Sequence, residues 1–249
     1  MSGRPPYAFE NHSLADHMFR CLALIEDFMR INRNYLNAAY TRLNRAGLDV
    51  PKLETIEDML RIGAVIHDLG KAYKYYQERL EKYGGGFEYH EILSTISCYK
   101  ILRNNYLSEN LGLEVLLLMS ILNHHQAFRE SISEILFDDS SSINKVIRIA
   151  KMGLCEGVSH LEPVLNKLGL TVNEVFAKDI EIASMLNEVR EILNSFLRRR
   201  FDENRRWIKL YNLVMFPIIL VDNLDACEKR GGRQNRLVIA ELRKVMIDE

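Results

Sequence analysis

The sequence predicts an all-α protein. Apolar residues recur every three to four positions along most of its 249 residues, and strictly alternating stretches are scarce. Only five prolines and thirteen glycines interrupt a chain rich in Leu, Ile, Glu, Arg and Lys, which are good helix formers. Because no repeat or interdomain linker stands out, we expect a single domain over residues 1–249, with a substantial core.

The first half of the chain predicts three helices. An apolar stripe that starts at Leu14 predicts a helix to about Arg45, where Ala46-Gly47 and then Pro51 stop it. A second helix is expected from about Thr55. The glycines at 84–86 predict a loop, and a third helix is expected over residues 88–103.

The second half continues the helical pattern. Residues 111–125 are apolar almost all round, which predicts a central helix. Residues 138–142 predict a loop and N-cap for a helix from Ile143. Further helices are expected over residues 178–199, 204–227 and 234–247.

Composition limits the class of protein. The net charge of −1 does not commit the whole molecule to a polyanion, so any such site must be local. The four cysteines are far apart and form no CxxC pair, which disfavours a cysteine-based zinc site and is typical of a reduced cytoplasmic protein. The N-terminus lacks the apolar core of a secretory signal, and the apolar stretch 210–221 is too short to span a bilayer. We expect a soluble protein without membrane contact.

Histidines are concentrated where the predicted helices look buried. Burying several imidazoles without compensation costs free energy. One histidine on an apolar face is usually an ordinary core residue, but five at helix positions, with internal aspartates nearby, favour a shared metal. The six histidines in or beside such places are His12, His17, His67, His90, His124 and His125. We expect His12 to lie in an N-terminal loop and His160 to lie on the surface.

The strongest local pattern is GAVIHDLGK, residues 63–71. His67 and Asp68 diverge by about 100° around a helix, yet they can converge on one ion at a helix end. Lys71 follows Asp68 by three residues, which places its ammonium over the same face.

These residues resemble the signature of the HD phosphohydrolase superfamily: a lone His, then His-Asp, then a late Asp. HDLGK matches the central motif, His17 in HSLADHMFRCLALI matches the first histidine, and Asp222 in LVDNLDA matches the closing aspartate. The resemblance implies an HD-domain helical bundle with one metal held by His17, His67, Asp68 and Asp222.

Three more histidines resemble the second-metal ligands of two-metal HD enzymes. They are His90 in YHEILS and the pair His124-His125 in LNHHQAF, with Asp68 shared between the two ions. Over residues 12–228 the chain is most similar to the CRISPR-associated HD nuclease of type I systems, in its stand-alone form without the helicase. That family often has Gly before the histidine of this third motif, where the present chain has Tyr89.

This resemblance implies a phosphodiesterase with a buried two-metal centre of Mn, Mg, Co, Ni or Fe ions. A metal-activated water would attack single-stranded DNA, or RNA, and Lys71 would offset charge on the phosphoryl oxygens. A separate CRISPR helicase and a surveillance complex would supply the substrate. The basic residues around an aromatic that would contact the strand are Arg199, Arg200, Arg205, Arg206 and Trp207, although such charge runs are also typical of solvated faces.

Some alternatives stay open. Asp225 lies three residues beyond Asp222 on the same helical face, so either could approach the metals, and we favour Asp222. An HD phosphohydrolase acting on nucleotides or cyclic dinucleotides would use the same centre. A non-catalytic HD scaffold is the third reading, which the presence of every ligand type together with Lys71 disfavours.

Overall fold

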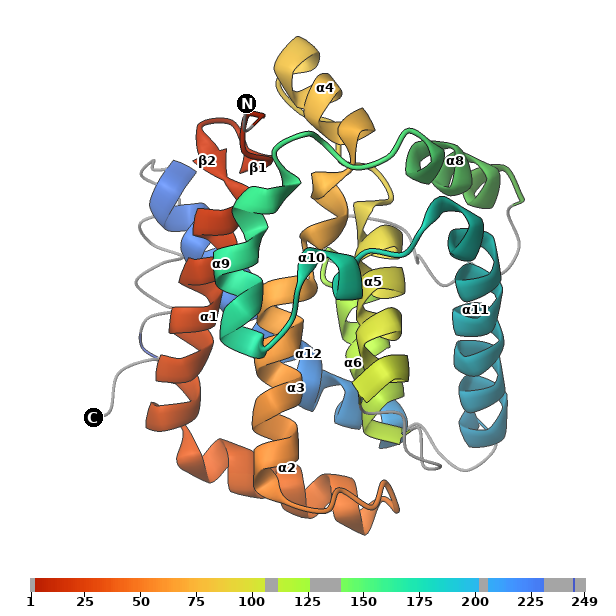
Figure 1. Cartoon of the computed structure of the whole chain (residues 1–249). Helices are drawn as coiled ribbons and strands as arrows, with labels where there is room; N and C mark the ends of the chain where they lie inside the picture. The colour runs from red at the N-terminus through yellow and green to blue at the C-terminus, as the bar shows by residue number, and fades with distance from the viewer. Residues whose placement is uncertain (1–2, 106–111, 126–139, 202–205, 231–243, 245–249) are drawn as a thin grey trace.

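The chain folds almost entirely into helices, which confirms the predicted all-α class (Figure 1). The computed structural model describes residues 3–105, 112–125, 140–201, 206–230 and 244. The long helices are α1 (Leu14–Ile31), α2 (Arg33–Arg45), α3 (Leu53–Ile66), α4 (Lys74–Tyr83), α5 (His90–Asn105), α6 (Gly112–Leu122), α8 (Ser140–Lys151), α11 (Asp179–Phe201) and α12 (Arg206–Arg230). The short elements are strands β1 (Tyr7–Phe9) and β2 (His12–Ser13), helices α9 (Glu162–Leu165) and α10 (Val172–Val175), and 3-10 turns η1 (Leu69–Ala72), η3 (Val158–Leu161) and η4 (Asn166–Leu168).

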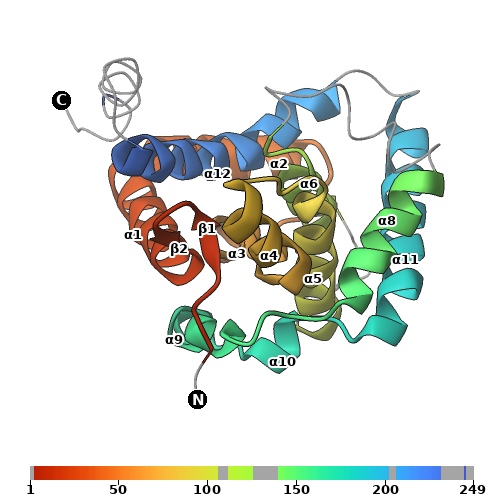
Figure 2. The same ribbon diagram turned by 90° about the horizontal axis from the view of Figure 1, so that it is seen from above.

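Helix α3 is the centre of the bundle. It packs against α1, α5, α6 and α12, and nearly every residue in its last two turns is buried. Gly63 makes this packing possible, because a β-carbon there would lie only 2.4 Å from Cδ1 of Ile218 on α12. Figure 2 shows α12 crossing one side of the bundle, with α9 and α10 on the opposite side.

Helix α12 carries the apolar stretch that the sequence predicted to be a core helix. Leu210–Lys229 is long and apolar enough to cross a membrane, a test that the core helix of a globular protein also meets. Buried side chains such as Val214, Ile218 and Val221 pack into the common hydrophobic core, and α12 contacts α6, α1 and α3. This placement confirms the core-helix prediction.

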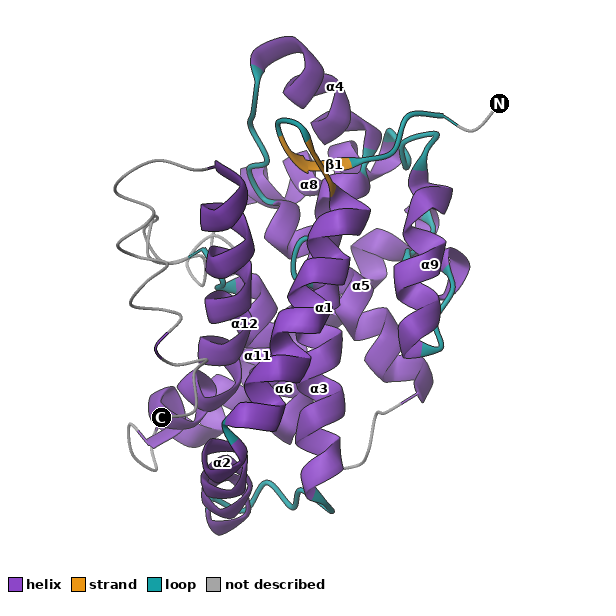
Figure 3. Ribbon diagram, turned by 90° about the vertical axis from the view of Figure 1, so that its left-hand side faces the viewer, coloured by secondary structure: helices purple, strands orange, loops and turns teal. Residues whose placement is uncertain are grey.

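The structure differs from the sequence prediction near the N-terminus. The expected helix 14–45 is two helices, because Asn32 leaves helical geometry at φ −97° and ψ 47° and its side chain donates to the Phe28 carbonyl. Helix α2 therefore turns away beneath the bundle (Figure 3). Strands β1 and β2 form a small antiparallel hairpin that was not predicted. The predicted helix 234–247 lies outside the described residues, apart from the helical residue 244.

Gly70 in η1 is in close contact with the start of α5. A β-carbon at this position would lie 2.1 Å from the backbone carbonyl oxygen of His90. The Gly70 amide also donates to the Ser94 hydroxyl at 2.8 Å. The turn that carries Asp68 and Lys71 is thereby fixed against the first turn of α5.

We predict that Gly70→Ala lowers the free energy of unfolding by about 1–3 kcal/mol, because backbone must move to admit the methyl group. Gly85→Ala is the matched control, since a β-carbon there meets nothing within 4 Å. Denaturant unfolding of the metal-free proteins measures both. Equal stability of the two variants would show that η1 and α5 are not in rigid contact.

Candidate metal centre

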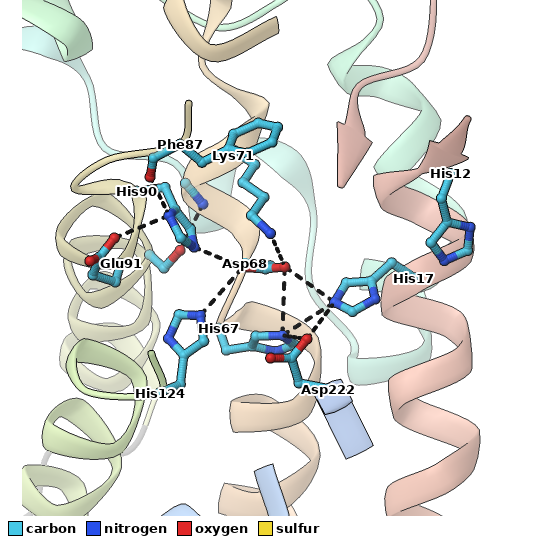
Figure 4. Close-up of polar contacts among 12 residues, drawn as sticks. His12, His17, His67, Asp68, Lys71, Phe87, His90, Glu91, His124 and Asp222 are labelled. Carbon is cyan, nitrogen blue, oxygen red and sulfur yellow. Dashed lines mark hydrogen bonds and ion pairs between the residues drawn. The ribbon is translucent and has the colours of Figure 1, made fainter. Parts of the chain in front are cut away.

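Five helices bring the predicted ligand residues to one buried place (Figure 4). Helix α3 ends at Ile66, so that His67 and Asp68 occupy the turn into η1. His90 is the first residue of α5, and His124 and His125 follow the end of α6 after Asn123. The other two come from within helices: His17 from the first turn of α1, and Asp222 from α12.

One group of donors lies around Oδ2 of Asp68. That oxygen is 3.2 Å from Nε2 of His17 and 3.8 Å from Nε2 of His67. Oδ1 of Asp222 lies 3.6 Å from each of the same two nitrogens. One potential ligand atom from each of the four residues lies within 4.8 Å of the others. The arrangement is compact enough to hold one ion.

A second group lies on the other side of the same carboxylate. Oδ1 of Asp68 is 2.8 Å from Nε2 of His90 and 3.4 Å from Nε2 of His124. With His125, which is half-buried, these residues again offer ligand atoms within 4.8 Å of one another. Asp68 therefore belongs to both groups and faces each with a different oxygen.

Backbone carbonyls orient three of the imidazoles. Nδ1 of His67 lies 3.0 Å from the Ala64 oxygen, and Nδ1 of His124 lies 2.6 Å from the Ile121 oxygen. Nδ1 of His90 lies 2.5 Å from the carbonyl oxygen of Phe87. A carbonyl can only accept, so Nδ1 donates in each case. The Nε2 atoms are left to face the carboxylates, which is the orientation that metal-binding histidines adopt.

His124 supplies the clearest test of whether the residues fit a metal. Burial lowers the pKa of this imidazole, so the ring is neutral, with its one proton on Nδ1. Its buried Nε2 has no hydrogen-bond partner among the described residues and points its lone pair toward the Asp68 carboxylate. A lone pair facing a carboxylate is unfavourable unless a cation lies between them. The mixed imidazole and carboxylate donors suit a divalent transition metal.

The electrostatics of the buried groups agree with a site that attracts cations. Burial alone would raise the pKa of Asp68, but Lys71 and the surrounding imidazoles hold it well below its ordinary value. The pKa of Asp222 is likewise lowered, since hydrogen bonding and charge from His67 outweigh the effect of burial. Burial opposes protonation of His17, yet Cys21, Asp225 and Asp68 together raise its pKa well above the ordinary value. Both aspartates are therefore ionised.

Lys71 lies inside the site rather than on the surface. Its ammonium is 2.5 Å from Oδ2 of Asp68 and 5.1 Å from the centre of the Phe87 ring, and the residue is only 7% exposed. The reading of Lys71 as a solvated surface lysine is excluded by this burial. Its positive charge therefore lies beside Asp68, the residue that the two donor groups share.

The two aspartates of α12 take different positions. Asp222 contacts the group around His17 and His67, whereas Oδ2 of Asp225 lies 2.6 Å from Nδ1 of His17, on the far side of that ring. Asp222 thus belongs to the group of donors around Asp68, while its choice as the ligand stays a prediction. The expectation for His12 was wrong: it lies in β2, is buried, and contacts Asp225. The sequence reasoning missed the possibility that the segment before α1 folds back as a hairpin.

The predicted strand-binding residues are not placed by the structure. Arg205 lies outside the described residues, and the side chains of Arg199, Arg200, Arg206 and Trp207 are outside them as well. A separate groove of about 740 Å³ lies between the N-terminal segment and α4, with glutamates outnumbering basic residues among its lining side chains. None of the clustered donors lines it, and its charge disfavours a polyanion.

Comparison with known proteins agrees with the motifs. No family model matches the sequence. A CRISPR-associated endonuclease Cas3-HD of Saccharolobus solfataricus is 28% identical over 236 residues, which cover 91% of this chain and 90% of that protein. A protein of the same name from Methanocaldococcus jannaschii is 21% identical over 246 residues, 96% of each chain.

The fold has a solved counterpart. The structure of a CRISPR-associated Cas3 HD domain protein from Methanocaldococcus jannaschii matches with a TM-score of 0.57 and 21% identity, over 88% of this chain and 98% of that one. The match shows that the helical arrangement is that of an HD domain. The resemblance that the HD motif predicted is therefore confirmed: the chain is similar to CRISPR-associated HD proteins over about nine tenths of its length.

Proposed function

We propose that this protein is a metal-dependent nuclease that cleaves single-stranded DNA, or RNA, in CRISPR interference. The observation that carries the proposal is the position of Asp68, whose two carboxylate oxygens face two separate groups of nitrogen and oxygen donors. The two curated relatives, both named as CRISPR-associated endonucleases, support the same activity. The cleavage would be endonucleolytic or exonucleolytic.

Each donor group would hold one divalent ion, of Mn, Mg, Co, Ni or Fe. His17, His67 and Asp222 would serve the first ion, His90, His124 and His125 the second, and Asp68 would serve both. Two ions held by these residues would lower the pKa of a water molecule and offset negative charge on the oxygens of a phosphodiester. The helix-end hydrogen bonds of His67, His90 and His124 keep their Nε2 atoms directed inward throughout.

Lys71 would act on the substrate phosphate. In the structure its ammonium is paired with Asp68 and held above the Phe87 ring. If the Asp68 carboxylate binds metal ions, its ion pair with Lys71 would weaken. The Lys71 ammonium could then contact a non-bridging phosphoryl oxygen of the substrate. A cation held in advance at that place stabilises negative charge that grows in the transition state.

Burial favours a single strand over a duplex as substrate. Six of the seven donor residues are buried, and His125 is half-buried, so a phosphate has to enter a narrow site. One flexible strand can bend a phosphate into such a place more readily than a duplex can. Arg199, Arg200, Arg205, Arg206 and Trp207 remain our candidates for contacts farther along the strand.

We propose further that the whole chain acts as a single cytoplasmic domain. A CRISPR helicase and a surveillance complex would supply the single strands. We expect the protein to act without membrane contact.

We predict that Asp68→Ala abolishes cleavage of labelled single-stranded DNA while the helical content persists. The assay compares single-stranded DNA, RNA, duplex DNA and cyclic dinucleotides after the protein is stripped of metal and reloaded with Mn²⁺, Mg²⁺, Co²⁺ or Ni²⁺. Asp27→Ala is the matched control, because Asp27 is an exposed aspartate outside the donor groups whose ion-pair partner is Arg30. Full activity of Asp68→Ala would refute the proposed centre. Turnover of cyclic dinucleotides alone would move the protein to small-molecule hydrolysis, and no turnover with bound metal would indicate a scaffold.

We also predict that metal binding releases protons and strengthens as pH rises. Burial would lower the pKa of His90, but Glu91 and Asp68 raise it to about 8. At neutral pH the metal-free imidazole is therefore protonated, and it must lose that proton to bind an ion. Affinity should rise with pH through about 8 as His90 loses its proton, and the raised pKa of His17 extends the rise to higher pH. Titration calorimetry in buffers of different ionisation enthalpy measures the release; heats that do not depend on the buffer would contradict it.

A further inference from the structure

His17 differs from the other clustered histidines in what holds its ring. His67 and His124 lie at helix ends, where the last carbonyls have no partner within the helix and can accept from Nδ1. His17 lies in the first turn of α1, where the backbone carbonyls already accept helix hydrogen bonds, because only the last turn leaves carbonyls without a helical partner. Its Nδ1 donates instead to Oδ2 of Asp225, at 2.6 Å, from helix α12. A charged carboxylate thus does for His17 what a backbone carbonyl does elsewhere.

Asp225 is fully buried and shares that oxygen with a second imidazole. Nε2 of His12 lies 2.8 Å from the same Oδ2. A carboxylate oxygen has two lone pairs, so both rings can donate to it at once. Oδ1 of Asp225 has no hydrogen-bond partner among the described residues. The two histidines therefore determine which oxygen faces His17.

The hairpin that carries His12 is fixed at a second point. The side chain of Gln77 on α4 accepts from the Tyr7 amide at 2.8 Å and donates to the Tyr7 carbonyl at 3.1 Å. The same amide nitrogen of Gln77 lies 2.6 Å from the Lys71 carbonyl oxygen. The ring of Phe9 lies 4.8 Å from the ring of His12. The N-terminal hairpin is thereby joined to both the Lys71 turn and α12.

We propose that Asp225 and His12 are positioning residues for the first metal ion, with the N-terminal hairpin as a structural part of the centre. Asp225 keeps the proton of His17 on Nδ1 and its Nε2 directed at Asp68 and Asp222. His12 keeps the Asp225 carboxylate in the orientation in which its Oδ2 faces Nδ1 of His17. The proposal rests on the proposed function, because it requires that the group around His17 bind an ion.

The test is Co²⁺ titration of the metal-free full-length chain, followed by visible absorption, in a His124→Ala background that weakens the second group. Asp225→Asn should weaken binding at the remaining site about 10–100-fold and alter its cobalt spectrum. His12→Ala should weaken it less, and His12→Gln should restore it, because the glutamine amide can replace the Nε2 donor. His160→Ala is the matched control, since that histidine is exposed and belongs to none of the donor groups.

Thermal unfolding of the metal-free variants separates positioning from a purely structural role. Positioning predicts that Asp225→Asn unfolds at the wild-type temperature or above, because a buried charge has been removed, while its cobalt affinity falls. A lower unfolding temperature with unchanged affinity would overturn the inference. The inference would also be overturned if wild type bound a third ion that Asp225→Asn did not bind, because Asp225 would then be a metal ligand. If wild type binds no cobalt, the proposed function fails together with it.

Discussion

The buried carboxylate of Asp68 is the constraint on which the rest of this structure depends. An ionised carboxylate with 1% exposure is costly unless opposite charge and hydrogen-bond donors surround it. Lys71 supplies one charge directly, and four imidazoles supply nitrogen atoms on both sides. Nε2 of His124 carries a lone pair, because the pKa of this ring is lowered and its Nδ1 donates to the Ile121 carbonyl, so the protein alone does not complete the compensation. Cations between Asp68 and the imidazoles would complete it.

Helix ends explain how so many donors reach one point. A histidine at the end of a helix finds a carbonyl that no helical amide has used, and this carbonyl fixes the ring without any further residue. The breaks after α3 and α6 therefore serve the site directly. His17 and Asp222 come from within helices, where no such carbonyl is free. For His17, the acceptor for Nδ1 comes from the neighbouring helix α12 and is the carboxylate of Asp225.

The chemistry of the centre could be predicted from sequence better than its supports could. His67, Asp68 and Lys71 stand in one short motif, and the order of the other ligands along the chain matches a known signature. The environment of His12 could not be predicted in this way, because its partner Asp225 lies 213 residues away. The break at Asn32 was missed because the apolar spacing continues through it, and a single side-chain hydrogen bond to Phe28 accompanies the turn. Gly70 shows the same limit, since only the folded chain brings the His90 carbonyl against it.

The most direct test of the central claim is anomalous diffraction at the manganese edge, from crystals grown with Mn²⁺. Our account predicts two peaks about 4 Å apart, one on each side of the Asp68 carboxylate. The first would lie among His17, His67 and Asp222, and the second among His90, His124 and His125. A single peak, or peaks away from these residues, would contradict a two-ion centre shared through Asp68.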